Sequence, residues 1–144
     1  MGEAAPPVQG VLETGLYVAD VDRSVQFYER LFGFTRLHAD HRFAALEVIP
    51  HRQVLLLFRK GATLTAIRIP GGTIPPHDGD GQLHFAFAVD ATMIERWVAR
   101  LAEQDVALES RVRWERGGES LYFRDPDGNL GELATPGLWW PAGP

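Results

Sequence analysis

The chain has 144 residues, 45% of them hydrophobic, which suits one globular domain with its own core. Its net charge of −5 and its lack of a long basic run argue against nucleic acid as the main partner. It has no cysteine, which excludes disulfides, thiolate metal sites and cysteine nucleophiles. No apolar run approaches the length of a membrane span and residues 1–10 lack a signal-peptide core, so we expect a cytoplasmic protein without membrane contacts.

The first half of the chain predicts one strand, one helix and three further strands. The expected ranges are 11–19 for the first strand, 22–32 for the helix, and 34–39, 43–49 and 54–60 for the other strands. Asp20 is placed to cap the helix and Gly33 to end it. Alternation along the first strand sends Leu16 and Val18 to the core, whereas Glu13 and Tyr17 share the opposite face.

The second half repeats this order. Strands are expected over 82–89, 106–112, 120–124 and 130–135, with a helix over 92–104. Glu13 and His84 lie 71 residues apart, as do Val18 and Val89, so each pair occupies matching places in two copies of one βαβββ unit. We therefore expect a single domain over 11–135, made of modules 11–60 and 82–135, a linker rich in proline and glycine over 61–81, and tails at 1–10 and 136–144.

Two segments near the C-terminus have a distinctive composition. Residues 121–133 read as strand, turn and strand, with the turn chemistry of Asp-Pro-Asp-Gly-Asn between the strands. Glu132 is the one charged residue of the second, mostly apolar strand. If it is buried, its carboxylate must be paired, bound to a metal or facing a cavity. The alternative is that the strand lies at the edge of a sheet and Glu132 is in water. Trp139 and Trp140 in the tail are expected to be buried against the body or against a partner subunit.

Glu13, His84 and Glu132 are the candidates for a metal site. An imidazole and two carboxylates converging on one sheet face suit a divalent metal such as Mn, Fe, Zn, Ni or Mg. The repeat supports this set, because it gives Glu13 and His84 equivalent positions on the same face. The alternative for each residue is an ordinary polar side chain at the surface.

Four further residues are candidates for substrate binding. His77 lies in a proline-stiffened loop just before the His84 strand and would reach over a pocket mouth, or would be a plain surface residue. Arg124 would bind an anionic group or be a charge at a strand end. Tyr17 and Trp114 would line a pocket or serve as packing residues.

Two motifs give the chain a family resemblance. One is the run LYVADVDRSVQFYERLFGF over 16–34, and the other is YFRDPDGN over 122–129, followed by Glu132. In this order around a βαβββ repeat, they make 11–135 similar to the vicinal oxygen chelate superfamily, which includes glyoxalase I, fosfomycin-resistance proteins, bleomycin-resistance proteins and extradiol dioxygenases. The resemblance implies an α+β fold in which two βαβββ modules pair into a curved, mostly antiparallel sheet cup with helices outside.

The resemblance also implies a ligand set. Members of this superfamily place metal ligands at four strand positions, which fall here on Glu13, about Leu56, His84 and Glu132. Glu13 stands where histidine is common, and Leu56 cannot ligate, so the remaining pattern is similar to that of the fosfomycin-resistance enzymes with one histidine replaced. Members of this length usually form a homodimer with sites built from both subunits, so Glu13 would meet His84 and Glu132 of the partner subunit.

Two functions follow from this pattern. The first, which we favour, is an enzyme that depends on a divalent metal, namely Mn, Fe, Ni or Zn. It would act on a small oxygen-rich substrate as a lyase, isomerase, transferase or dioxygenase. Glu13, if it does not bind the metal, would act as a general base. The second is a metal-free protein of the bleomycin-resistance type that binds a cationic or aromatic ligand, a reading favoured by Leu56 and Glu13.

Overall fold

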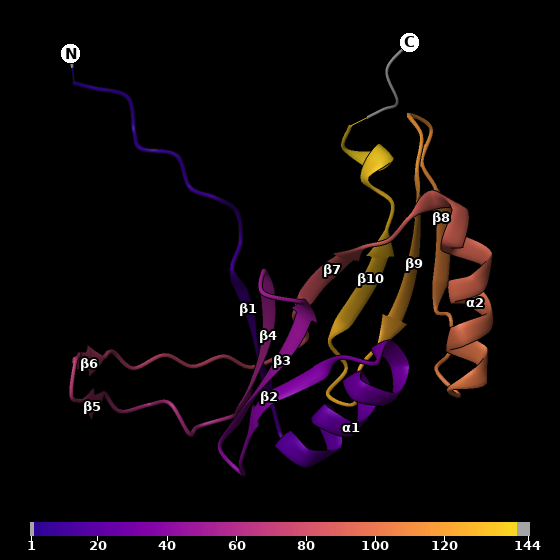
Figure 1. The fold of residues 1–144 in the computed structure, drawn as a ribbon. Coiled ribbons are helices and arrows are strands. Elements are labelled where there is room, and N and C mark those ends of the chain that lie inside the picture. The colour runs from indigo at the N-terminus through magenta and orange to yellow at the C-terminus, as the bar shows by residue number, and fades with distance from the viewer. Residues whose placement is uncertain (1, 141–144) are drawn as a thin grey trace.

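The computed structural model describes residues 2–140 and shows two βαβββ modules joined by a long hairpin arm (Figure 1). The first module consists of β1 (Glu13–Val18), α1 (Val21–Phe32), β2 (Thr35–Ala39), β3 (Phe43–Ile49) and β4 (Gln53–Arg59). The second consists of β7 (His84–Ala88), the 3₁₀ turn η1 (Ala91–Met93), α2 (Ile94–Glu103), β8 (Ser110–Arg113), β9 (Glu119–Arg124) and β10 (Leu130–Ala134). The arm carries β5 (Ile67–Ile69) and β6 (Gly72–Ile74), and the 3₁₀ turn η2 (Pro136–Leu138) follows β10.

The two modules have the same sheet topology. The strand order is β1-β4-β3-β2 in the first sheet and β7-β10-β9-β8 in the second. In each sheet the first strand of the module pairs in parallel with the last, and the other pairs are antiparallel. The predicted α+β fold of two repeated units is confirmed. It leaves β1 and β7 as edge strands, which present unpaired backbone groups.

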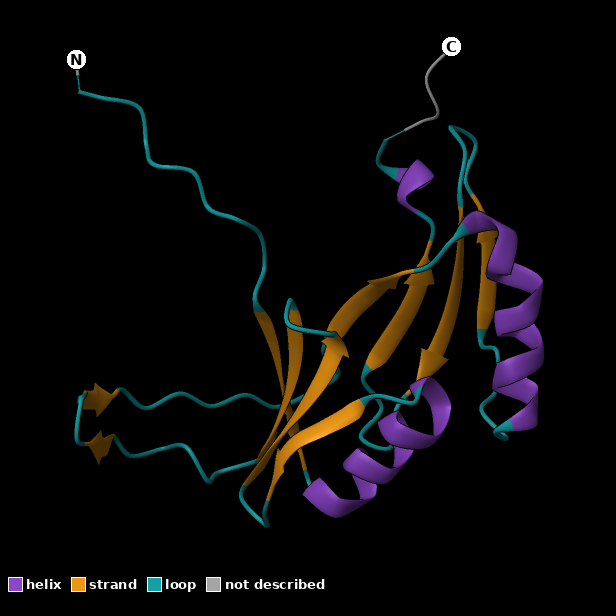
Figure 2. Cartoon of the chain, in the orientation of Figure 1, coloured by secondary structure: helices purple, strands orange, loops and turns teal. Residues whose placement is uncertain are grey.

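The core lies between the apolar faces of the two sheets and their helices. Leu16 and Val18 of β1 are buried, as the alternation predicts, and they join Phe85 and Phe123 of the second module in one cluster. Figure 2 shows α2 lying along the second sheet, with α1 beneath the two sheets. Burial of apolar surface from both modules makes them one packed unit.

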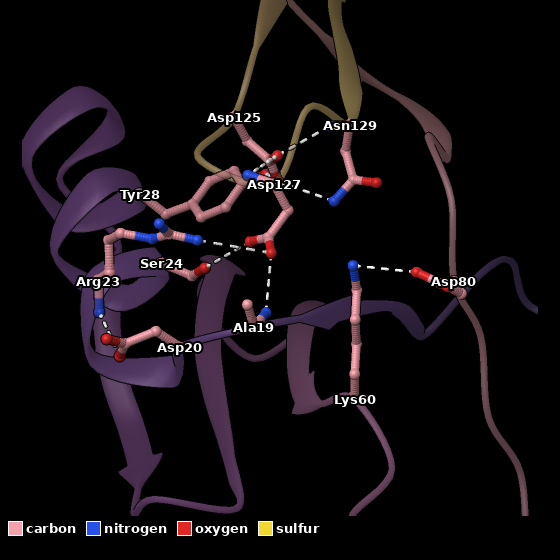
Figure 3. A network of polar contacts seen from close by, with 10 residues as sticks. All are labelled: Ala19, Asp20, Arg23, Ser24, Tyr28, Lys60, Asp80, Asp125, Asp127 and Asn129. Carbon is pink, nitrogen blue, oxygen red and sulfur yellow. Dashed lines mark hydrogen bonds and ion pairs between the residues drawn. The ribbon is translucent and has the colours of Figure 1, made fainter.

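The start of α1 is tied to the β9–β10 turn (Figure 3). Asp127 accepts hydrogen bonds from the backbone N–H of Ala19 at 2.7 Å and from the Ser24 hydroxyl at 3.3 Å. Asp125 accepts one from the Tyr28 hydroxyl at 2.8 Å. Burial and then the Asp125 charge raise the pKa of Tyr28 well above its usual value. The turn that the sequence predicts as a hairpin connection therefore also joins the two modules.

The arm over 61–81 extends away from the two modules (Figures 1 and 2). We call the place where its two ends meet the first module the arm root. The root is fixed by the Lys60–Asp80 ion pair at 3.1 Å and by the His77 backbone N–H, which donates to the Thr63 carbonyl at 2.9 Å. Farther out, the apolar side chains are exposed: Leu64 by 59%, Ile69 by 49% and Ile74 by 44%.

Three details differ from the sequence prediction. Trp139 and Trp140 are 72% and 73% exposed, so the expected burial against the body is wrong; burial on a partner subunit stays a prediction. The second helix begins with a 3₁₀ turn because Asp90 accepts from the Thr92 backbone N–H at 2.8 Å. The strand expected from residue 106 begins only at Ser110, after Asp105 adopts a φ of 54°. Over 2–140, no helix combines the length and apolar character of a membrane span.

Candidate metal centre

Glu132 is buried in the centre of the second sheet. Its strand, β10, lies between β7 and β9, and the residue is 7% exposed, so the alternative of an edge strand in water is wrong. In the register of the sheet, its neighbours are Ala86 on β7 and Tyr122 on β9. A carboxylate in this position requires compensating donors or a cation.

His84 supplies a nitrogen next to this carboxylate. Its Nε2 lies 3.2 Å from Oε1 of Glu132, and its Nδ1 lies 2.8 Å from the backbone carbonyl of Leu130. A carbonyl oxygen can only accept, so Nδ1 carries a hydrogen and donates it. A neutral imidazole would then point a lone pair from Nε2 at a carboxylate oxygen. Two acceptors in such contact need either a hydrogen or a metal ion between them.

This pair fits two ligands of a divalent metal. The donor set is one imidazole nitrogen and one carboxylate oxygen, which suits Mn, Fe, Ni or Zn. The bond from Nδ1 to the Leu130 carbonyl is the kind of contact that fixes the tautomer of a metal-binding histidine. The side chain of His84 is 52% exposed and that of Glu132 is 9% exposed, so the nitrogen side remains open to further ligands.

Glu13 does not join this pair within one chain. It is exposed on edge strand β1, where its register neighbour is Val54 on β4. Within 2–140, no three residues among His, Cys, Asp and Glu are gathered as a group that could hold a metal. Leu56, at the fourth ligand position implied by the resemblance, lies on β4 in register with Gly15. The chain thus brings together two of its three predicted ligands.

Ser120 and Trp114 form a hydrogen-bonded chain to Glu132. The Ser120 hydroxyl donates to Oε2 of Glu132 at 2.5 Å and accepts a hydrogen bond from Trp114 Nε1 at 2.9 Å. Sequence reasoning chose Trp114 for substrate binding and missed Ser120. Alternation alone places Ser120 on the same face of β9 as Tyr122, and the register that brings this face beside Glu132 is seen only in the structure.

Tyr122 is a second residue that the sequence reasoning missed. It is the cross-strand neighbour of Glu132, and its ring centroid lies 6.4 Å from that of His84. Burial and then the negative charge of Glu132 raise the pKa of Tyr122. A neutral hydroxyl therefore stands beside the carboxylate.

Tyr17 and His77 are brought together on the first module. The Tyr17 hydroxyl lies 2.6 Å from Nδ1 of His77. The backbone carbonyl of His77 accepts from the Thr63 hydroxyl, which fixes the arm root over the sheet. The two side chains lie at one end of an aromatic row across the first sheet, whose stacked members are Tyr17, Phe58, Phe43 and His38.

Arg124 is engaged within the second module. Its Nε donates to Glu109 at 2.9 Å and its Nη1 to the Gly128 carbonyl at 3.1 Å, so it ties the β9–β10 turn to the segment before β8. Its role in substrate binding stays a prediction.

A cavity of about 290 Å³ opens beside His84, between the first module and β7. Its lining is mainly apolar and includes Leu12, Leu55 and Phe87. His84 is thus the member of the candidate metal pair that lines this cavity.

Known proteins match this chain over most of its length. The metallothiol transferase FosB of Staphylococcus epidermidis is 32% identical over 123 residues, covering 82% of this chain and 75% of that protein. The glutathione transferase FosA of Serratia marcescens is 30% identical over 131 residues, covering 91% and 84%. The crystal structure of lactoylglutathione lyase from Agrobacterium tumefaciens superposes with a TM-score of 0.83 at 32% identity, covering 94% of this chain and 99% of that one. Residues 10–133 match the Glyoxalase/Bleomycin resistance protein/Dioxygenase superfamily, and the chain therefore belongs to this superfamily.

Proposed function

We propose that this protein is a divalent-metal-dependent enzyme that acts on a small oxygen-rich molecule. The observation that carries the proposal is the pairing of His84 Nε2 with Glu132 Oε1 at 3.2 Å, with the hydrogen of His84 held on Nδ1 by Leu130. This geometry provides a place for a shared cation between two ligand atoms. Transfer is the reaction type we put first, since two of the relatives above are named as transferases.

The third ligand in this proposal is Glu13 of the partner subunit in a homodimer. Glu13 is exposed at the start of an edge strand, and His84 lies on the edge strand of the other sheet. Edge strands have free backbone groups that a second copy can approach. A metal held by these three residues would supply a Lewis acid for the oxygens of a bound substrate.

A thiol, or a molecule formed from one, is our proposal for one substrate. The transferases are named for a metallothiol and for glutathione, and the lyase is named for lactoylglutathione. The mainly apolar cavity beside His84 would hold the carbon skeleton of the substrate. Tyr17 of the partner subunit, on the same strand face as Glu13, and the partner's His77 would contact its far end over the aromatic row. Trp114, 40% exposed, would form another wall.

The test is metal content per chain, measured by elemental analysis after separate loading with Mn, Fe, Ni and Zn. We expect near-stoichiometric uptake of at least one metal, lost in His84→Ala. His38→Ala is the matched control, because His38 is also an exposed strand histidine with a carboxylate partner, Asp40, at 2.9 Å. Uptake that is equal in the wild type and His84→Ala would contradict the proposal.

A second candidate is a metal-free binding protein of the bleomycin-resistance type. The mainly apolar cavity and the aromatic row favour it, because both suit a planar or apolar ligand. In this case, ligand addition would quench tryptophan fluorescence equally before and after chelator treatment. No uptake of any of the four metals would leave this as the better function.

A further inference from the structure

The two oxygens of the Glu132 carboxylate have different partners. Oε1 faces His84 Nε2 at 3.2 Å, whereas Oε2 accepts the hydrogen of the Ser120 hydroxyl at 2.5 Å. The Ser120 oxygen in turn accepts from Trp114 Nε1 at 2.9 Å. An indole N–H can only donate and a carboxylate can only accept, so the direction of the whole chain is fixed from Trp114 through Ser120 to Glu132.

This direction decides which carboxylate oxygen is free. Ser120 is fully buried, and its hydroxyl has a donor on one side and an acceptor on the other, so its hydrogen is committed to Oε2. Rotating the carboxylate so that neither oxygen faces Ser120 would lose this charge-assisted bond. Oε1 is left as the oxygen that faces the imidazole.

The position of Trp114 is itself supported by the fold. Its backbone closes a turn with Gly118, whose carbonyl accepts from the Trp114 N–H at 3.1 Å. Gly118 has a φ of 87°, and a Cβ at this residue would lie 2.5 Å from the backbone nitrogen of Leu138. The turn is therefore seated against the segment after β10, which fixes the backbone from which the Trp114 indole reaches Ser120.

We propose that Trp114 and Ser120 are positioning residues that hold Glu132 as a one-oxygen ligand toward the cation it shares with His84. The positioning role toward a metal rests on the proposed metal-dependent function. The Trp114–Ser120–Glu132 hydrogen-bond chain itself can be tested in the metal-free protein. It assigns Trp114 a role through its N–H group, in addition to any contact of its exposed ring with substrate.

The metal-free test uses the indole ¹H–¹⁵N signals of the four tryptophans. Glu132→Gln weakens the acceptor at the end of the chain, so the Trp114 signal should shift while those of Trp97 and the exposed Trp139 stay in place. Ser120→Ala should shift the Trp114 signal further and speed exchange of its N–H with water. A Trp114 signal that is unchanged in both variants would overturn the inference, whether or not the protein binds a metal.

The metal-dependent test measures by calorimetry the affinity for whichever of Mn, Fe, Ni and Zn the wild type takes up. Trp114→Phe keeps a ring but loses the donor, and should weaken affinity about 10-fold; Ser120→Ala should weaken it about 10- to 100-fold. Ser120→Thr keeps the hydroxyl and should restore most of the affinity, and Trp139→Phe should match the wild type. Wild-type affinity in both Trp114→Phe and Ser120→Ala would overturn the positioning role. A wild type that binds none of Mn, Fe, Ni and Zn would overturn it together with the proposed function, and the indole shifts would then report only a structural chain.

Discussion

The Tyr28 hydroxyl of α1 donates a hydrogen bond to Asp125 at 2.8 Å and so joins the first module to the β9–β10 turn of the second. Both groups are buried: Tyr28 is 0% exposed and Asp125 5%. Asp125 also accepts from the backbone N–H groups of Asp127 and Asn129. The same carboxylate thus holds the turn in shape and fixes where helix α1 meets it.

Tyr28→Phe should lower the free energy of unfolding by about 1.5–3 kcal/mol, because it removes one hydrogen bond from a buried carboxylate. Chemical denaturation measures this. Arg23→Gln is the control on the same network: the Arg23–Asp127 pair spans 3.6 Å and the Arg23 side chain is 50% exposed, so its loss should cost less than about 1 kcal/mol. Equal losses of unfolding free energy in the two variants would show that the Tyr28–Asp125 hydrogen bond contributes no more to stability than the exposed Arg23–Asp127 ion pair.

The repeat and the faces of its strands could be predicted from sequence because the core imposes them. Leu16 and Val18 must face the core, so Glu13 and Tyr17 must face the other way. The 71-residue spacing of the repeat then places His84 on the equivalent face of the second module. The pairing of His84 with Glu132 follows from the parallel contact of β7 and β10. These features depend only on alternation within strands and on the topology of one module.

The remaining parts of the site depend on contacts that alternation does not determine. The Ser120–Glu132 bond requires the register of β9 against β10, and the direction of the Trp114 indole requires the turn at Gly118. Whether Glu13 meets His84 depends on how whole modules are arranged in space, which no local pattern encodes. The exposure of Trp139 shows the same limit, because hydrophobicity alone predicts burial.

Glu132→Gln should lower the pKa of Tyr122 toward its usual value. Burial is the main cause of the raised pKa and stays in the variant, but the negative charge of Glu132, which disfavours the ionised phenol, is removed. The ¹³Cζ signal of Tyr122, followed over alkaline pH, measures the change. Glu47→Gln, on the first sheet, should leave the titration unaltered. A Tyr122 pKa that is the same in Glu132→Gln and the wild type would show that the charge of Glu132 does not act on the Tyr122 hydroxyl.

Asp40 should stabilise the β2–β3 turn at neutral pH and lose this effect only in strong acid. The Phe43 backbone N–H, the His38 ring and the Arg42 backbone N–H lower the pKa of Asp40 to about 2. A lowered folded-state pKa gives stability that is present above the unfolded-state pKa of about 3.9 and is lost as pH falls through the folded-state value. The difference in melting temperature between the wild type and Asp40→Asn should therefore be constant from pH 7 to about 5 and should shrink between about pH 4 and 2. Glu3→Gln, in the exposed N-terminal segment, is the control; a gap that is constant down to pH 2 would contradict the assignment.

Gly79→Ala should displace the arm root from Tyr17. A Cβ at residue 79 would lie 2.3 Å from Cδ2 of the Tyr17 ring, so either the ring or the arm must move, and the 2.6 Å contact between Tyr17 and His77 would be broken. We expect a loss of about 1–3 kcal/mol in the free energy of unfolding and a shift of the His77 ring signals in NMR spectra. Gly71→Ala is the matched control, since a Cβ there meets nothing within 4 Å. If Gly79→Ala keeps both wild-type stability and the wild-type His77 signals, the arm root is free to adjust, and the Tyr17–His77 contact does not fix its position over the first sheet.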